Sequence, residues 1–220
     1  MRNFVFGMGT GCCGTASLAW LLNSQDNAFV GHELFPILPW SSSVEARNNF
    51  AENKWEQLNH ESHLYGIVGD VATYYLPYVR FLLHNLETLK EDEIDFKFII
   101  LRRDKEEVIS AFLEKFKRQN NNPLQNVDSE NIEKNNWDTS FPDYPPGMPL
   151  NIAIECYWED YYAEADWLVK YHPKKVRIFE TEDLNNEEKV LEILKFAGIR
   201  NPKAFTGIRK NKRNDASNFD

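Results

Sequence analysis

Residues 3–18 read NFVFGMGTGCCGTASL, in which a short apolar run leads into a glycine-rich turn and then into a helical pattern. The run predicts a buried strand over 3–8, and the apolar spacing after the turn predicts a helix over 15–23. A glycine-rich turn that ends at a helix N-terminus presents free backbone N–H groups and the positive end of the helix dipole. The segment therefore predicts a site for a phosphate-like anion, the alternative being a tight structural turn before a capped helix.

The glycines of this turn have the spacing of a phosphate-binding loop. Gly9 and Gly14 match the pattern G-x-x-x-x-G, but Thr15 stands where such a loop carries a lysine. The candidate anion-binding residues belong to the turn and to the helical turn that follows it: Gly11, Cys12, Cys13, Gly14, Thr15, Ala16 and Ser17.

Strands and helices alternate along the rest of the chain. Further strands are predicted over 28–32, 65–68, 96–101 and 176–179, and helices over 43–58, 76–89, 151–171 and 186–197 and directly after Asp104. This order is typical of an α/β fold in which a parallel sheet carries helices on both faces. Prolines and asparagines break both periods over 118–150, so an irregular insert or lid is expected there. We expect one domain over 1–220, with a basic and loosely ordered tail over 207–220.

Composition excludes several classes of protein. The 220 residues are 42% hydrophobic and 27% charged, which is ordinary for a globular protein and excludes wholesale disorder, collagen and coiled coil. The formal net charge of -9 repels a polyanion, so nucleic acid is not an expected partner. No run of 18 apolar residues occurs, so no membrane span is expected.

The three cysteines favour a reducing compartment. Cys12 and Cys13 are adjacent and Cys156 is far away, so neither a disulfide framework nor a metal site has suitable spacing. We therefore expect a cytoplasmic protein without a bound metal. If Cys12 lies at the helix N-terminus, the dipole is expected to depress the pKa of its thiol and to make it the most reactive of the three.

Ligands of parallel α/β sheets bind at the carboxyl ends of the strands. His32 and Glu33 follow the second predicted strand and could supply a general base, the alternative being a solvated pair in a turn. Asp70 follows the third strand. Its preferred interpretation is the cap of the next helix, and a contact with substrate is the second.

Two arginines follow the strand predicted over 96–101. Arg102 and Arg103 leave this buried strand beside the predicted anion site, with Ser110 one to two turns into the next helix. Such a pair predicts a second phosphate-binding group. The alternative is a surface arginine that pairs with Glu106 or Glu107.

Together these segments resemble the sulfotransferases that use 3′-phosphoadenosine 5′-phosphosulfate (PAPS), above all their small bacterial and phage-type branch. Residues 9–18 are similar to the 5′-phosphosulfate loop of that family, which ends G-T-x-S-L. His32-Glu33 with Leu38-Pro39-Trp40 is similar to the segment of the catalytic base, and Leu101 to Ser110 is similar to the 3′-phosphate segment. The carboxyl-terminal half resembles the branch at Trp137-Asp138, Phe141-Pro142, 157–162 and 182–185.

The resemblance implies a three-layer P-loop-type α/β domain with a parallel central sheet of four to five strands. It implies transfer of a sulfuryl group from PAPS, the donor co-substrate, to a hydroxyl or amine of a small-molecule, carbohydrate or lipid-like acceptor. The N–H groups of 11–16, with Thr15 and Ser17, would hold the 5′-phosphosulfate, and Arg102 or Arg103, with Ser110, would hold the 3′-phosphate. The remaining roles would be proton acceptance by Glu33 or His32, closure over the nucleotide by Arg209 and Lys210, and substrate binding by Asp70, Tyr74 and Trp137.

The loop departs from the family at one position. The family carries a lysine or arginine there, whereas this chain has Cys12 and no basic residue anywhere over 3–30. Two other functions therefore stay open. One is a P-loop phosphotransferase that uses ATP, which needs the lysine that Thr15 replaces. The other is a non-catalytic nucleotide-binding protein that has lost the loop cation.

Overall fold

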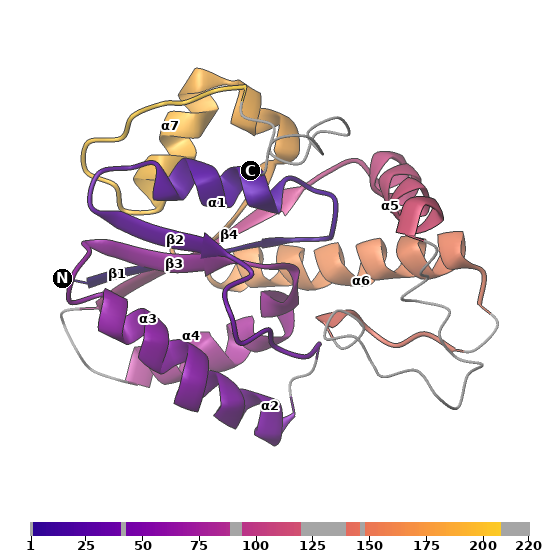
Figure 1. Ribbon diagram of the computed structural model, residues 1–220, viewed down its shortest axis with the longest axis horizontal. Coiled ribbons are helices and arrows are strands. Elements are labelled where there is room, and N and C mark those ends of the chain that lie inside the picture. The colour runs from indigo at the N-terminus through magenta and orange to yellow at the C-terminus, as the bar shows by residue number, and fades with distance from the viewer. Residues whose placement is uncertain (1, 41–42, 89–93, 120–139, 146–147, 208–220) are drawn as a thin grey trace.

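A five-stranded parallel sheet forms the centre of the molecule (Figure 1). The computed structural model describes residues 2–40, 43–88, 94–119, 140–145 and 148–207. The strands lie in the order β2-β3-β1-β4-β5, and their bounds are β1 (Arg2–Gly9), β2 (Ala28–His32), β3 (Ile67–Val71), β4 (Ile94–Arg102) and β5 (Val176–Glu180). All neighbouring pairs are parallel, which confirms the predicted α/β class.

Helices connect the strands and cover both faces of the sheet. On one face lie α1 (Thr15–Asn23) and α7 (Glu187–Phe196), the latter preceded by the 3-10 helix η4 (Thr181–Asn185) (Figure 1). The other face is covered by α2 (Val44–Asn49), the π-helical η1 (Phe50–Trp55), α3 (Glu56–Glu61), the 3-10 helix η2 (Thr73–Tyr78) and α4 (Val79–Thr88). Two helices follow β4, namely α5 (Lys105–Gln119) and α6 (Leu150–Tyr171).

The two-residue period of the strands divides the core between the two faces. Phe4, Phe6 and Met8 of β1 pack in the cluster that contains α2 to α6, whereas Val5 packs in the cluster under α1 and α7. β4 divides in the same way, with Phe96, Phe98 and Ile100 on the first side and Ile99 and Leu101 on the second. Because both faces are covered, the strands read as continuous apolar runs, and this is why they could be located in the sequence.

Three elements differ from their predicted bounds. The helix predicted over 43–58 extends to Glu61 and includes the π-helical turn η1. The helix predicted from 76 begins at Thr73 as a 3-10 helix, and it contains Pro77, which has no N–H to donate to an α-helical bond. The third strand covers Ile67–Val71 instead of 65–68, so Asp70 lies inside the strand and not after it.

The aromatic helix α6 packs on the same face of the sheet as α2, α3 and α4. Its buried tyrosines include Tyr157, Tyr161 and Tyr162. The Tyr161 hydroxyl donates to the carbonyl oxygen of Thr73, directly after β3, at 3.3 Å. Among the described residues, no helix, α6 included, is long and apolar enough to cross a membrane.

Candidate functional site

The glycine-rich loop lies at the carboxyl end of the central strand. β1 ends at Gly9, and α1 begins at Thr15 after Gly14, whose φ of 89° is left-handed and favours glycine. The first turn of α1 contains no acidic residue, and no side chain caps its N–H groups at the N-cap position. No negative charge in the first turn therefore compensates the positive end of the α1 dipole. An anion-binding site at a helix N-terminus requires such an uncompensated end.

Two side chains from neighbouring strand ends hold the loop by its carbonyl groups. Arg103, which follows β4, donates from Nη1 to the carbonyl oxygen of Cys12 at 2.9 Å. Thr181, which follows β5, donates from Oγ1 to the carbonyl oxygen of Cys13 at 2.7 Å. The loop is thus tied to the ends of β4 and β5, and neither tie occupies one of its N–H groups. No local pattern in the sequence marks Thr181 as part of the site.

Aromatic rings support the loop from the other side. The Tyr162 hydroxyl donates to the carbonyl oxygen of Leu101 at 2.7 Å and lies 3.3 Å from Oγ1 of Thr10. The ring of Phe112 occupies the place that a Cβ on Gly11 would need, so only glycine fits there. α5 and α6 therefore fix the shape of the loop through packing as well as hydrogen bonds.

The end of β2 meets the first residue of α1. His32 Nε2 lies 3.1 Å from Thr15 Oγ1. The next residue, Glu33, has a left-handed φ of 53°, and its N–H donates to the carbonyl oxygen of Val71 at 3.0 Å. A candidate general base and a candidate anion site are thus adjacent, which transfer of a group from an anionic donor requires.

The electrostatic surroundings of Glu33 favour its protonated form. Burial raises the pKa of the Glu33 carboxyl above its ordinary value near 4.5, and the charge of Asp70 acts in the same direction. The charges of His32 and Lys115 act against this rise. A carboxyl with a raised pKa accepts a proton more readily at neutral pH, which suits a general base.

We expect Glu33→Gln to stabilise the protein at neutral pH. The folded pKa of Glu33 lies above its unfolded pKa, so the unfolded state loses the proton first and stability falls as pH rises between the two values. Glutamine has no proton to lose. The variant should therefore melt a few degrees higher at about pH 7, and the difference should vanish below about pH 4. Thermal melting followed by circular dichroism measures this, and a lower melting temperature for the variant at neutral pH would contradict it.

The two arginines after β4 have different surroundings. Arg103 holds the loop as described and also pairs with Glu107 at 2.8 Å, which is the pairing that the alternative interpretation of the sequence expected. Arg102 instead pairs with Asp166 of α6, and its guanidinium lies 5.0 Å from the centre of the Tyr162 ring. Ser110 is exposed on α5. Of the two arginines, Arg103 is therefore the one in direct contact with the glycine-rich loop.

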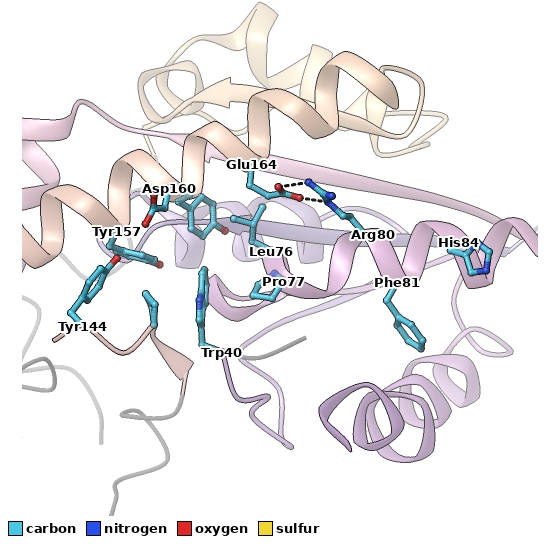
Figure 2. Close-up of a pocket in the computed structure, with 12 residues that line it drawn as sticks. Trp40, Leu76, Pro77, Arg80, Phe81, His84, Tyr144, Tyr157, Asp160 and Glu164 are labelled. Carbon is cyan, nitrogen blue, oxygen red and sulfur yellow. Dashed lines mark hydrogen bonds and ion pairs between the residues drawn. The ribbon is translucent and has the colours of Figure 1, made fainter. Parts of the chain in front are cut away.

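A pocket of about 650 Å³ opens beneath α6 (Figure 2). The rings of Trp40, Tyr144, Tyr157 and Tyr161 line it, together with side chains of α4. Its volume is in the range of small-molecule sites. Tyr157 packs against Phe112, the residue that contacts Gly11, with 6.3 Å between the two ring centres. The pocket and the loop are therefore separated by a layer of aromatic rings.

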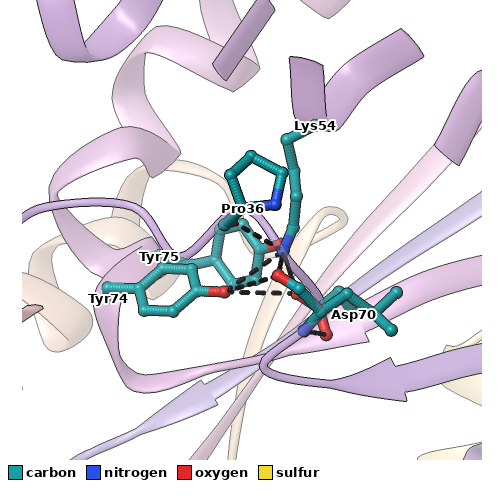
Figure 3. A network of polar contacts seen from close by, with 6 residues as sticks. Pro36, Lys54, Asp70, Tyr74 and Tyr75 are labelled. Atoms are coloured by element: carbon teal, nitrogen blue, oxygen red, sulfur yellow. Dashed lines mark hydrogen bonds and ion pairs between the residues drawn. The ribbon is translucent and has the colours of Figure 1, made fainter. Parts of the chain in front are cut away.

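The expectation that Asp70 caps a helix is wrong. The 3-10 helix η2 has Ala72 as its N-cap and no side-chain cap. Asp70 is fully buried and forms an ion pair with Lys54 at 2.8 Å (Figure 3). It also accepts hydrogen bonds from the Tyr75 hydroxyl at 2.7 Å and from the N–H of Leu34 at 3.1 Å.

The network around Asp70 fixes the segment that follows Glu33. Lys54 donates to the carbonyl oxygens of Leu34 and Pro36 and to the hydroxyl of Tyr74. Tyr74 is itself buried, like Asp70. We therefore propose that Asp70 and Tyr74 position the 33–36 segment, in place of the direct contact with substrate expected from the sequence.

Lys54 was not selected from the sequence, although a signal was present. Its side chain is 0% exposed, within a helix that reads as polar. Phe50 and Leu58, four residues before and after it, are both buried. A lysine between two core positions at helical spacing indicates a buried cation that needs an acidic partner.

We expect Lys54→Met to lower the free energy of unfolding by about 3–5 kcal/mol, because it leaves the Asp70 carboxylate buried without its cation. Urea denaturation measures this effect. Combining the change with Asp70→Asn should recover much of the loss, since no buried charge then remains. Lys203→Met, at an exposed ion pair with Asp26, is the control and should cost about 1 kcal/mol or less. An effect of Lys54→Met as small as the control would rule out the proposed role of the pair.

The expected depression of the Cys12 pKa is also wrong. Burial raises the pKa of the Cys12 thiol, and the charges of Lys115 and Arg103 offset only part of the rise. Cys12 precedes the N-cap Gly14 by two residues, so it lies outside the first turn of α1. Cys13 is fully buried, and burial raises the pKa of its thiol to about 12.

Lys115 of α5 brings a positive charge to the loop. It follows Phe112 by three residues, so the two share one face of the helix, and Phe112 packs on Gly11. The charge of Lys115 acts on both the Cys12 thiol and the Glu33 carboxyl, in each case to lower the pKa. Lys115 is far from the loop along the chain, so the sequence alone does not indicate that the two lie close together.

Three candidate residues, Trp137, Arg209 and Lys210, lie outside the residues that the structure describes. The structure brings together 9–17, His32, Glu33 and Arg103 at the carboxyl edge of the sheet. Asp70 and Tyr74 instead belong to the buried network that holds the segment after Glu33.

No protein-family model and no curated protein matches the sequence. Solved structures do match. The sulfotransferase from Alicyclobacillus acidocaldarius has a TM-score of 0.55 at 16% identity, over 95% of this chain and 87% of that one. The sulfotransferase domain from the curacin biosynthetic pathway has a TM-score of 0.54 at 15% identity, over 90% of this chain and 75% of that one. At these identities the likeness shows the fold, which this chain shares with sulfotransferases.

Proposed function

We propose that this protein is a sulfotransferase that moves a sulfuryl group from PAPS to a small-molecule, carbohydrate or lipid-like acceptor. The observation that carries the proposal is the contact of His32 with Thr15, which joins the candidate base to the candidate phosphosulfate loop. The fold shared with sulfotransferases supports it. The acceptor supplies a hydroxyl or an amine.

The two anionic ends of PAPS match two features of the carboxyl edge. The N–H groups of 11–16 and the hydroxyls of Thr15 and Ser17 hold the 5′-phosphosulfate, where the α1 dipole favours negative charge. Arg103, aided by Ser110, holds the 3′-phosphate, because its guanidinium already reaches the loop at Cys12. The 3′-phosphate is the group that distinguishes PAPS from ATP.

The reaction needs a base on the acceptor side of the sulfur. The acceptor oxygen or nitrogen forms a bond to sulfur while the bond from sulfur to the bridging phosphate oxygen breaks. The acceptor proton passes to Glu33 or His32, and adenosine 3′,5′-bisphosphate leaves. The raised pKa of Glu33 and the contact of His32 with Thr15 fit either residue for this step.

Lys115 takes the place of the cation that the loop lacks. Charge develops on the bridging oxygen as the bond to sulfur breaks, and a positioned ammonium group stabilises it. Cys12 is neutral, because its raised pKa keeps the thiol protonated. Lys115 shares the face of α5 that packs on the loop, and its charge acts on Cys12 and Glu33 alike. In this proposal the cation is therefore supplied by α5 and not by the loop itself.

Calorimetric titration with adenosine 3′,5′-bisphosphate, in parallel with ATP and magnesium, tests the proposal. We expect the bisphosphate to bind more tightly than ATP, without a need for magnesium. Binding of ATP alone would favour the phosphotransferase. Binding of the bisphosphate without turnover of PAPS on a panel of phenols, amines and sugars would favour a non-catalytic nucleotide-binding protein.

A further inference from the structure

The pocket beneath α6 contains an unbalanced negative charge. Its charged groups within the described residues are Arg80, Asp160 and Glu164, with His84 at one end. Arg80 donates to both carboxylate oxygens of Glu164 at 2.6 Å (Figure 2). Its guanidinium also stacks 3.9 Å from the centre of the Trp167 ring. That pair is neutral overall. No cation in the described ranges pairs with Asp160, so its carboxylate sets the charge of the pocket.

Aromatic rings surround the acidic end of the pocket. Trp40 meets the edge of Tyr157 with 5.6 Å between ring centres, and it lies 5.8 Å from Tyr161. Tyr144 lies close enough to Asp160 for the carboxylate to act on the pKa of its hydroxyl, together with burial. Ring faces beside a carboxylate are the features that bind organic ammonium groups.

The pocket lies apart from the proposed reaction site. Trp40 belongs to the segment that begins at Glu33, and Lys54 holds that segment at Leu34 and Pro36. On the other side, the ring of Tyr157 is next to Phe112, which contacts Gly11 of the loop. The rings of Tyr157 and Phe112 therefore lie between the pocket and the candidate donor site, and neither the loop nor the candidate base lines the pocket.

We propose that this pocket binds an aryl-alkylamine, with its ammonium group at Asp160 and its aromatic ring against Trp40 and Tyr157. This inference goes beyond the proposed function, because the pocket is a binding site apart from the reacting groups at the carboxyl edge. The ammonium group anchors the molecule at the carboxylate, and the rings hold its apolar part.

Three phenols that differ in charge test the proposal by calorimetry without nucleotide: tyramine, neutral 4-ethylphenol and anionic 3-(4-hydroxyphenyl)propionate. We expect tyramine to bind about tenfold more tightly than 4-ethylphenol, and the propionate to bind most weakly. Asp160→Asn should remove the preference for tyramine and leave 4-ethylphenol unchanged. Trp40→Leu should weaken both. Glu159→Gln is the matched control, since Glu159 is the neighbouring carboxylate on α6 and pairs with Lys105.

The same preparations separate this inference from the proposed function. Equal binding of the three phenols, or a tyramine affinity unchanged by Asp160→Asn, would overturn the amine site. If adenosine 3′,5′-bisphosphate still binds in that case, the sulfotransferase proposal stands. If tyramine binds through Asp160 but the bisphosphate does not bind, the amine site is supported and the sulfotransferase proposal fails.

Discussion

Lys115→Met lowers the turnover of PAPS by about 10²–10³ in the mechanism proposed here, because the charge on the departing bridging oxygen loses its stabilising cation. Affinity for adenosine 3′,5′-bisphosphate should change much less, since the backbone N–H groups of the loop remain. Single-turnover kinetics with saturating PAPS measures the chemical step, and titration of the bisphosphate measures binding.

Two further variants make this result specific. Lys105→Met removes a lysine from the same helix that pairs with Glu155 and Glu159, so turnover should stay within about twofold of the wild type. Cys12→Lys in the Lys115→Met background returns a cation to the loop and should recover part of the rate. Equal turnover of Lys115→Met and the wild type would exclude Lys115 from the reaction and would leave the missing loop cation without a replacement.

Arg103→Ala is expected to weaken binding of adenosine 3′,5′-bisphosphate by about ten- to a hundredfold. A hydrogen bond to a charged group contributes about 1.5–3 kcal/mol, and this change removes such a bond to the 3′-phosphate. The change also releases the carbonyl group of Cys12, which adds to the effect. Calorimetric titration of the folded variant, checked by its melting temperature, gives the affinity directly.

Arg102→Ala is the matched control for that experiment. Arg102 follows the same strand but contacts Asp166 and the ring of Tyr162, so we expect its loss to weaken nucleotide binding less than about threefold. Ser110 lies eight residues after Arg102 and seven after Arg103. A large loss of affinity in Arg102→Ala together with a small loss in Arg103→Ala would identify Arg102 as the residue that binds the 3′-phosphate.

The strands and the loop were predictable because their signals are local. Phe96 to Leu101 is a continuous apolar run, which a strand covered on both faces requires. Gly14 precedes a helical pattern, and its left-handed φ is the reason for a glycine there. The third strand was expected to end at 68, three residues too early, because Gly69 and Asp70 look like the start of a turn.

The contacts that complete the site were not predictable, because they join residues that are distant in the sequence. Asp70 has the local pattern of a helix cap, and only its burial against Lys54 shows a different role. Lys115 lies within the expected helix, and no residue near it in the sequence indicates that this lysine lies close to the loop. Cys12 was expected to be acidified by the helix dipole, but desolvation dominates once the neighbouring rings are packed around it.

Because of the strand order, the two sides of the site are held by residues that follow different strands. Arg103 and Thr181 reach the loop from the side of β4 and β5, whereas His32 reaches it from β2, on the other side of β1. The 33–36 segment is held by Lys54, which is not one of the residues that hold the loop. Under the proposed function, substitutions in the segment after β2 would therefore alter the base side of the site and leave the residues that hold the loop in place.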